Sequence, residues 1–428
     1  MKAYADMTKD ELLAVKEDLI KSYEDVKGKG ISLNMSRGKP SPEQLDIVMD
    51  MFDVFNRNTD FISESGVDTR NYGELTGIKE AKELFAELLD VEAKNVIVFG
   101  NGSLPVMYDT ISRSYSFGVN GSTPWNKLDK VKFLCPVPGY DRHFAITETF
   151  GIEMINIPLY EDGPDMELIK KYVEEDEAVK GIWCVPKYSN PTGSTYSDEK
   201  VKAFAALKPK ACDFRIYWDN AYAVHDLYED DKDELLNIFD ECKKHNNEDI
   251  VYEFASTSKI TLAGAGIAAV IASEKNLEWY KKNMTIQTIG YDKINMLRHV
   301  RYFKNAEGVR KKMKEHARIL APKFDAVIEC FDRELEGLGI GSYTRPKGGY
   351  FISFTAMKGT AKKIVEKCKE AGMITTGAGA TFPYKKDPDD SNIRIAPSFP
   401  TLNEIKEAAE LFSLCVKIVS IEEILKNK

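Results

Sequence analysis

The sequence predicts an α/β protein with two domains. We expect a large domain with a mostly parallel, seven-stranded sheet covered by helices, and a smaller α/β domain built from the N- and C-terminal segments. The first observation behind this prediction is that short apolar runs alternate with helical stretches from residue 95 onward. Such alternation is typical of a parallel sheet with helices on both faces. The seven expected strands are 95–99, 131–135, 153–158, 180–185, 214–218, 250–254 and 267–272.

The second observation concerns the ends of the chain. Further helices are indicated by apolar side chains at helical spacing and by a capping box that joins Thr401 to Glu404, and further strands by β-type runs. These are helices over 7–27 and 77–90, strands at 349–354 and 392–396, and a final helix of about 18 residues. The segment before residue 50 has no sheet partner of its own, so we assign it to the smaller unit. The predicted domains are 51–310 for the large domain, and 1–50 with 311–428 for the small domain.

Composition and charge disfavour several classes of protein. The chain has 428 residues, 43% of them hydrophobic, which is ample for two or three packed units. The net charge is −9 and no basic block occurs, so we expect neither nucleic acid nor a membrane as a partner. Seven cysteines are scattered without a C-x-x-C motif, which favours a reducing compartment, and hence the cytoplasm, and disfavours a zinc site. The polar, amphipathic N-terminus does not look like a secretory signal.

A lone lysine follows the strand expected at 250–254, and it bears on function rather than on the fold. Lys259 lies in the stretch EFASTSKITLAGAG, between hydroxyl residues and a run of small residues. Burial would lower the pKa of its amine and make it a nucleophile for carbonyl carbon, while Ser256 and Ser258 are suited to bind a phosphate. For a single lysine, a solvated surface position remains the ordinary alternative. The run GAGIAA at 264–269 also matches a loose dinucleotide fingerprint, but no strand directly precedes it, and we reject that reading.

Other polar clusters fall where expected strands end, which is where ligands bind in parallel sheets. GNGSL at 100–104 would present backbone amides at a helix N-terminus, although for this motif alone an ordinary strand–helix turn is the favoured interpretation. YSNPTG at 188–193 contains residues that are typical of a turn in any protein. Asp219 in YWDNAY is either a ligand-facing acid or a helix N-cap.

Taken together, these motifs resemble those of the pyridoxal-phosphate-dependent aminotransferases of fold type I. The resemblance covers roughly residues 30 to 410, and GYDRHF and STSKITLAGAG look most like a divergent subgroup of aspartate aminotransferases. It implies that the large domain binds pyridoxal 5′-phosphate. It also implies transfer of an amino group, we expect from aspartate, to 2-oxoglutarate through a lysine Schiff base and a pyridoxamine intermediate. The motifs occur in the family's order: NYGELTGIKEAKELFAELL, NGSL, PGYDRHF, YSNPTG, YWDNAY, STSK and NIRIAP.

The resemblance also implies a role for each matching residue. The catalytic group would be Lys259, which holds the cofactor, Asp219 on the pyridinium nitrogen, His143 behind Asp219, and Tyr140 stacked on the ring. The phosphate would be bound by Gly102, Ser103, Leu104, Ser256 and Ser258, and the phenolic oxygen of the ring by Asn190 and Tyr222. Tyr72 would reach the phosphate of the neighbouring subunit, which implies a homodimer with shared active sites. The substrate carboxylate would be bound by Arg394, Gly38 and Asn190, and no metal is implied.

Two departures from the family pattern leave questions open. The family places a phosphate-binding arginine where this chain has Ile267. The family arginine that binds the substrate's second carboxylate also has no clear counterpart here. The candidates for that second cation are Arg37, Lys39, Arg142, Lys187 and Lys293.

Two other functions stay open at this point. The same cofactor would serve a β-lyase or an amino-acid decarboxylase, since the outcome depends on which substrate bond is oriented for cleavage. The third possibility is a non-catalytic effector-binding domain of a regulator, which the roughly 30 non-basic residues before the match do not favour.

Overall fold

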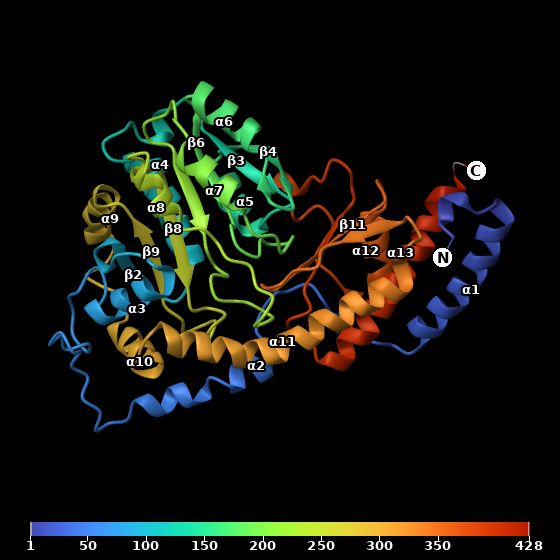
Figure 1. Cartoon of the computed structure of the whole chain (residues 1–428), viewed down its shortest axis with the longest axis horizontal. Helices are drawn as coiled ribbons and strands as arrows, with labels where there is room; N and C mark the ends of the chain where they lie inside the picture. Colours follow the sequence, from blue (N-terminus) through green and yellow to red (C-terminus); the bar gives the residue numbers. More distant parts are fainter. Residues whose placement is uncertain (1, 427) are drawn as a thin grey trace.

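The larger part of the molecule is built around an eight-stranded sheet (Figure 1). The computed structural model describes residues 2–426 and 428. The strand order is β2-β9-β8-β7-β6-β3-β4-β5. The strands are β2 (Val96–Phe99), β3 (Lys132–Val137), β4 (Glu153–Tyr160), β5 (Gly163–Pro164), β6 (Val179–Cys184), β7 (Arg215–Asp219), β8 (Val251–Ser256) and β9 (Ala268–Ala272).

The sheet confirms the predicted mostly parallel arrangement. Strands β4, β3, β6, β7 and β8 pair in parallel, while β9 pairs antiparallel with both β8 and β2. All seven expected strands are present within two residues of their predicted ends. The eighth strand, β5, pairs antiparallel with β4 and has only two residues, too few for any periodicity to indicate it.

Successive side chains of a strand point to opposite faces of the sheet. Because apolar side chains therefore lie on both faces, helices cover both. On β7, Ile216 and Trp218 pack into one core and Tyr217 into the other. The first core includes side chains of α3 (Lys79–Leu89), α6 (Met166–Glu175), α7 (Asp198–Ala205), α8 (Ile238–Lys243) and α10 (Lys293–Phe303). The second includes side chains of α4 (Ser103–Phe117), α5 (Asp141–Thr149) and α9 (Glu274–Gln287).

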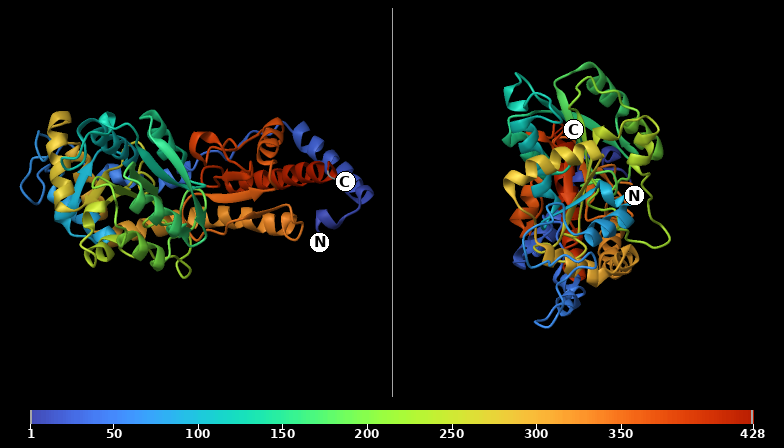
Figure 2. Two further views of the ribbon diagram at one scale, coloured as in Figure 1. Left: turned by 90° about the horizontal axis from the view of Figure 1, so that it is seen from above. Right: turned by 90° about the vertical axis from the view of Figure 1, so that its left-hand side faces the viewer.

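The smaller part combines segments from both ends of the chain, and Figure 2 shows it beside the larger part with both termini in it. Its three-stranded antiparallel sheet has the order β10-β11-β13, and a separate parallel pair joins β1 to β12. The strands are β1 (Leu33–Asn34), β10 (Gly341–Tyr343), β11 (Ile352–Ala356), β12 (Met373–Ile374) and β13 (Asn392–Ile395). The helices are α1 (Lys9–Gly28), α2 (Pro42–Asp46), α11 (Ala306–Leu335), α12 (Ala361–Glu370) and α13 (Leu402–Leu425).

The N-terminal segment packs on this smaller part, as the sequence predicts. Leu33 pairs with Met373, the backbone N–H of Tyr4 donates to Leu338 O at 3.0 Å, and α1 packs against α13. The long helix α11 runs beneath both parts in Figure 1 and begins at Ala306, so it contains the predicted boundary at residue 310. The exact domain limits stay a prediction.

The two helices expected at 7–27 and 77–90 correspond to α1 and α3. The Thr401–Glu404 capping box is present at the start of α13, which has 24 residues rather than about 18. No helix in the described part of the chain is both long and apolar enough to cross a membrane.

Candidate active site

The loops that follow the sheet strands meet at one edge of the sheet, because β2, β3, β6, β7 and β8 all run in the same direction. A cavity of about 440 Å³ opens there, between these loops and residues of the smaller part. Nine of the residues predicted from the sequence line it, namely Gly38, Ser103, Leu104, Tyr140, Asn190, Asp219, Tyr222, Lys259 and Arg394.

A buried acid and histidine form the floor of this site. Asp219 is the last residue of β7 and is 3% exposed, and its Oδ2 lies 2.9 Å from His143 Nε2. His143 is stacked on Trp183, with ring centroids 4.4 Å apart and planes at 10°. The other carboxylate oxygen of Asp219, Oδ1, is buried and has no hydrogen-bond partner among the described residues. A buried polar atom normally has a partner, so Oδ1 is free to accept a hydrogen bond from a ligand.

Lys259 extends toward the same cavity from the turn after β8. Its Nζ lies 4.8 Å from the centre of the Tyr222 ring and 6.0 Å from that of Tyr350. Burial lowers the pKa of the Lys259 amine, while the negative charge of Asp219 partly opposes that shift. The environment therefore favours a neutral, nucleophilic amine.

Tyr140 and Tyr222 belong to the same group of residues. Tyr140 directly precedes α5, and its ring lies edge-on to His143 at 4.9 Å. Burial, helped by the charge of Asp219, raises the pKa of Tyr140 to about 12, and burial also raises the pKa of Tyr222. Both phenols therefore stay protonated near neutral pH and can donate hydrogen bonds.

Beside Lys259, two hydroxyl groups and the start of α4 form a cradle. Ser256 Oγ donates to Ser258 Oγ at 3.0 Å, and Ser258 Oγ donates to Asn101 O at 3.1 Å. Gly102 precedes α4 in extended backbone, and a Cβ placed on it would lie 3.5 Å from Ser258 Oγ. The free N–H groups at the start of a helix of this length favour an anion. Ile267 is 1% exposed and contributes no charge here.

Arg394 enters the cavity from β13 of the smaller part. Its Nη1 donates to Asp141 Oδ1 at 2.8 Å and to Asn190 Oδ1 at 3.2 Å, and its Nε lies 3.4 Å from Thr376 Oγ1. The guanidinium also lies 4.8 Å from the centre of the Phe351 ring. Asparagine, threonine and phenylalanine together fix the plane of this cation, as a bidentate carboxylate site requires.

Gly38 approaches Phe351 so closely that no side chain fits on it. A Cβ at Gly38 would lie 2.2 Å from Phe351 Cζ, the ring that supports Arg394. The glycine is therefore required by close packing at the cavity wall.

The five candidates for a second cation separate into two groups. Arg37 and Arg142 line the cavity. Lys187 is instead buried against Asp226 at 2.9 Å, Lys293 donates to Gly73 O at 3.1 Å, and Lys39 lies 3.9 Å above the ring of Phe399. These three lysines do not line the cavity.

Tyr72 is not part of this chain's own cavity. Its side chain is 83% exposed, and it lies in a separate surface hollow with Arg70, Tyr291 and Lys293. A role for Tyr72 therefore requires a second chain, and it stays a prediction.

Sequence reasoning missed three residues of the site: Asp141, Thr376 and Phe351. Asp141 stands inside the motif GYDRHF, but its partner Arg394 is 253 positions away in the chain, and no local pattern signals such a contact. Thr376 lies in a loop of the smaller part that carries no motif. Phe351, which the sequence places in a strand at 349–354, directly precedes β11 (Ile352–Ala356) instead.

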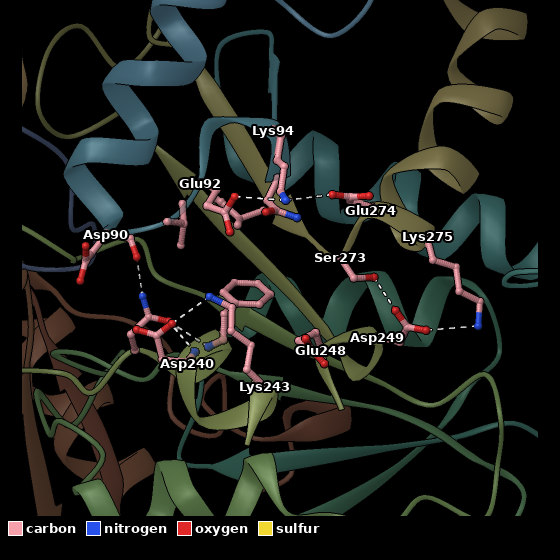
Figure 3. Close-up of a pocket in the computed structure, with 15 residues that line it drawn as sticks. Asp90, Glu92, Lys94, Asp240, Lys243, Glu248, Asp249, Ser273, Glu274 and Lys275 are labelled. Carbon is pink, nitrogen blue, oxygen red and sulfur yellow. Dashed lines mark hydrogen bonds and ion pairs between the residues drawn. The ribbon is translucent and has the colours of Figure 1, made fainter. Parts of the chain in front are cut away.

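A second pocket, of about 350 Å³, lies at the opposite edge of the sheet (Figure 3). Its lysines are paired with neighbouring acids, as Lys94 is with Glu92 and Glu274 at 3.1 Å each and Lys275 with Asp249 at 3.2 Å. None of the predicted site residues line it.

Comparison with known proteins supports this fold and shows the family. Residues 7–428 match the family described as aspartate amino-transferase. An aspartate aminotransferase from Corynebacterium glutamicum is 45% identical over 95% of this chain and 94% of its own length. A crystal structure of an aspartate transaminase from the same species superposes with a TM-score of 0.95 at 43% identity, over 99% of both chains.

A more distant structure shows the fold alone. An α-aminoadipate aminotransferase from Thermus thermophilus, solved with N-(5′-phosphopyridoxyl)-L-leucine, superposes with a TM-score of 0.74 at 17% identity, over 96% of both chains. The family match and the close relatives, together with this shared fold, show that the class is an aminotransferase of fold type I. Within it, the chain belongs to the aspartate aminotransferase family. The lyase, decarboxylase and regulator alternatives are not favoured.

Substitution of Gly38 tests whether close packing against Phe351 is needed for activity. We expect Gly38→Ala to lower kcat/KM for amino transfer by about tenfold or more, because Phe351 must move and Arg394 with it. Gly377→Ala is the matched control, since Gly377 lines the same cavity and its Cβ would meet nothing within 4 Å. Equal activities of the two variants in a coupled assay would contradict the proposed packing constraint.

Proposed function

We propose that this chain transfers the amino group of aspartate to 2-oxoglutarate with pyridoxal 5′-phosphate as cofactor. The observation that carries the proposal is the unpartnered Oδ1 of buried Asp219, in one cavity with Lys259 and Arg394. A protonated pyridine nitrogen would satisfy this carboxylate oxygen, and the cradle of Gly102, Ser103, Ser256 and Ser258 is suited to a phosphate. The residues present therefore fit the cofactor.

When bound, this cofactor supplies an electron sink and accepts the amino group. In our proposal Asp219 keeps the ring nitrogen protonated, and His143 holds Asp219 in place. Tyr140 would cover one face of the ring, while Asn190 and Tyr222 would donate hydrogen bonds to the phenolic oxygen. Because Ile267 is neutral, the negative charge of a bound phosphate would be stabilised chiefly by the backbone amides at the start of α4.

Lys259 has two roles in the proposal. It holds the cofactor until substrate arrives, and it then moves the proton from the substrate's α-carbon. The second role requires an amine that is neutral near physiological pH, and the lowered pKa of Lys259 supports it.

The substrate's carboxylates need separate cations. Arg394 and the backbone N–H of Gly38 bind the α-carboxylate, and the fixed guanidinium plane supports a two-point contact. A second carboxylate left unpaired in a closed site would cost several kcal/mol. Arg37 and Arg142 line the cavity and are our candidates for this charge.

We further propose a cytoplasmic homodimer in which Tyr72 of each chain contacts the phosphate bound by the other. Tyr72, Ile286 and Ile289 are 83%, 78% and 62% exposed, and a second chain would bury such side chains if it packed over them. All seven cysteines are free, which agrees with a reducing compartment.

Profiling of amino donors tests the proposed reaction. We expect kcat/KM for aspartate to exceed that for alanine or phenylalanine. Arg37→Ala or Arg142→Ala should raise the KM for aspartate by about tenfold or more while changing that for alanine little, because alanine has no second carboxylate. Lys39→Ala is the control, since Lys39 is exposed but does not line the cavity. Equal kcat/KM for alanine and aspartate would refute dicarboxylate specificity.

Mixing inactive chains tests the shared site. Lys259→Ala and Tyr72→Ala should each be inactive, and their mixture should recover about a quarter of wild-type activity, because half of the dimers regain one intact site. The control mixes Lys259→Ala with Asp219→Ala, two residues of the same cavity, and should recover nothing. Active monomers in sedimentation, or verified heterodimers without activity, would contradict the shared site.

A further inference from the structure

The Asp141–Arg394 contact places a protein carboxylate on the cation that is proposed to bind substrate. The exposed fraction of the Arg394 side chain is 8%, and that of Asp141 is 35%. A cation this buried is costly without a counter-charge, and Asp141 supplies one. We propose that Asp141 is a positioning residue that occupies the carboxylate site of Arg394 until the substrate carboxylate displaces it. The proposal rests on the proposed function of Arg394.

The geometry of the contact makes the exchange favourable. Asp141 binds Arg394 through a single pair of atoms, Oδ1 and Nη1, at 2.8 Å. Among the described residues, Nη2 of Arg394 has no hydrogen-bond partner. A free carboxylate can bind both nitrogens of the fork, so it gains one more charge-assisted hydrogen bond than Asp141 makes.

The displaced carboxylate keeps a favourable environment. Asp141 is the first residue of α5, where the free N–H groups and the helix dipole stabilise negative charge. Arg142, the next residue, lines the same cavity. Asp141 can therefore leave Arg394 without becoming an isolated buried charge, whereas Arg394 cannot be left unpaired.

The exchange has a consequence for affinity. Asp141 competes with every incoming carboxylate for Nη1, and its negative charge repels that carboxylate at close range. Removal of the charge at position 141 should therefore strengthen carboxylate binding. A residue that merely supported the fold, or that held Arg394 in its binding pose, would have the opposite effect when its charge is removed.

The test is calorimetric titration of the holoenzyme with succinate, a dicarboxylate that has no amino group to transfer. We expect Asp141→Asn to lower the Kd for succinate by about tenfold. Asp141→Ser, which removes the charge and shortens the side chain, should lower it as well. Asp198→Asn is the matched control, because Asp198 is also the first residue of its helix, α7, but lies outside the cavity. The Kd of this variant for succinate should equal that of the wild type.

The outcomes separate this proposal from the proposed function. If Arg394→Ala binds succinate as tightly as the wild type, Arg394 is not the carboxylate site, and both proposals fall. If Arg394→Ala abolishes binding while both Asp141 variants bind succinate with unchanged or weaker affinity, the function of Arg394 stands and the exchange is refuted. Melting temperatures of all variants show whether each remains folded under the titration conditions.

Discussion

The buried carboxylate of Asp219 is the constraint on which the rest of the site depends. A charge this deep in the core costs several kcal/mol unless it is paired. One oxygen is held by His143, which Trp183 keeps in plane, and the other has no partner among the described residues. The fold thus holds one carboxylate oxygen without a hydrogen-bond partner at the end of a central strand, in the same cavity as Lys259. In our proposal a protonated ring nitrogen completes this arrangement.

The cavity needs both parts of the molecule. The sheet contributes the groups proposed to hold the cofactor, because its parallel strands end at one edge. The smaller part contributes Arg394, Gly38 and the Phe351 ring beneath the guanidinium. Movement of one part against the other would therefore change how substrate is held while leaving the Asp219–His143 pair intact.

Much of this arrangement could be predicted from sequence, because strand periodicity and motif order are local signals. The seven long strands and the polar residues at their ends follow from such patterns, whereas β5 and β10 are too short to leave one. Contacts between residues far apart in the sequence could not be predicted in this way. The contact of Asp141 with Arg394 joins residues 253 positions apart, and the distinction between Arg142 and Lys187 as cavity cations required three-dimensional packing.

The role of Asp219 is tested most directly by the single-turnover reaction of the holoenzyme with aspartate, followed by absorbance of the bound cofactor. Asp219→Asn keeps the size of the side chain and the contact with His143 but removes the charge. It should slow this half-reaction by about a thousandfold or more while the cofactor remains bound, because a neutral pyridine is a poor electron sink. A rate within about tenfold of the wild type would contradict the proposed role of Asp219.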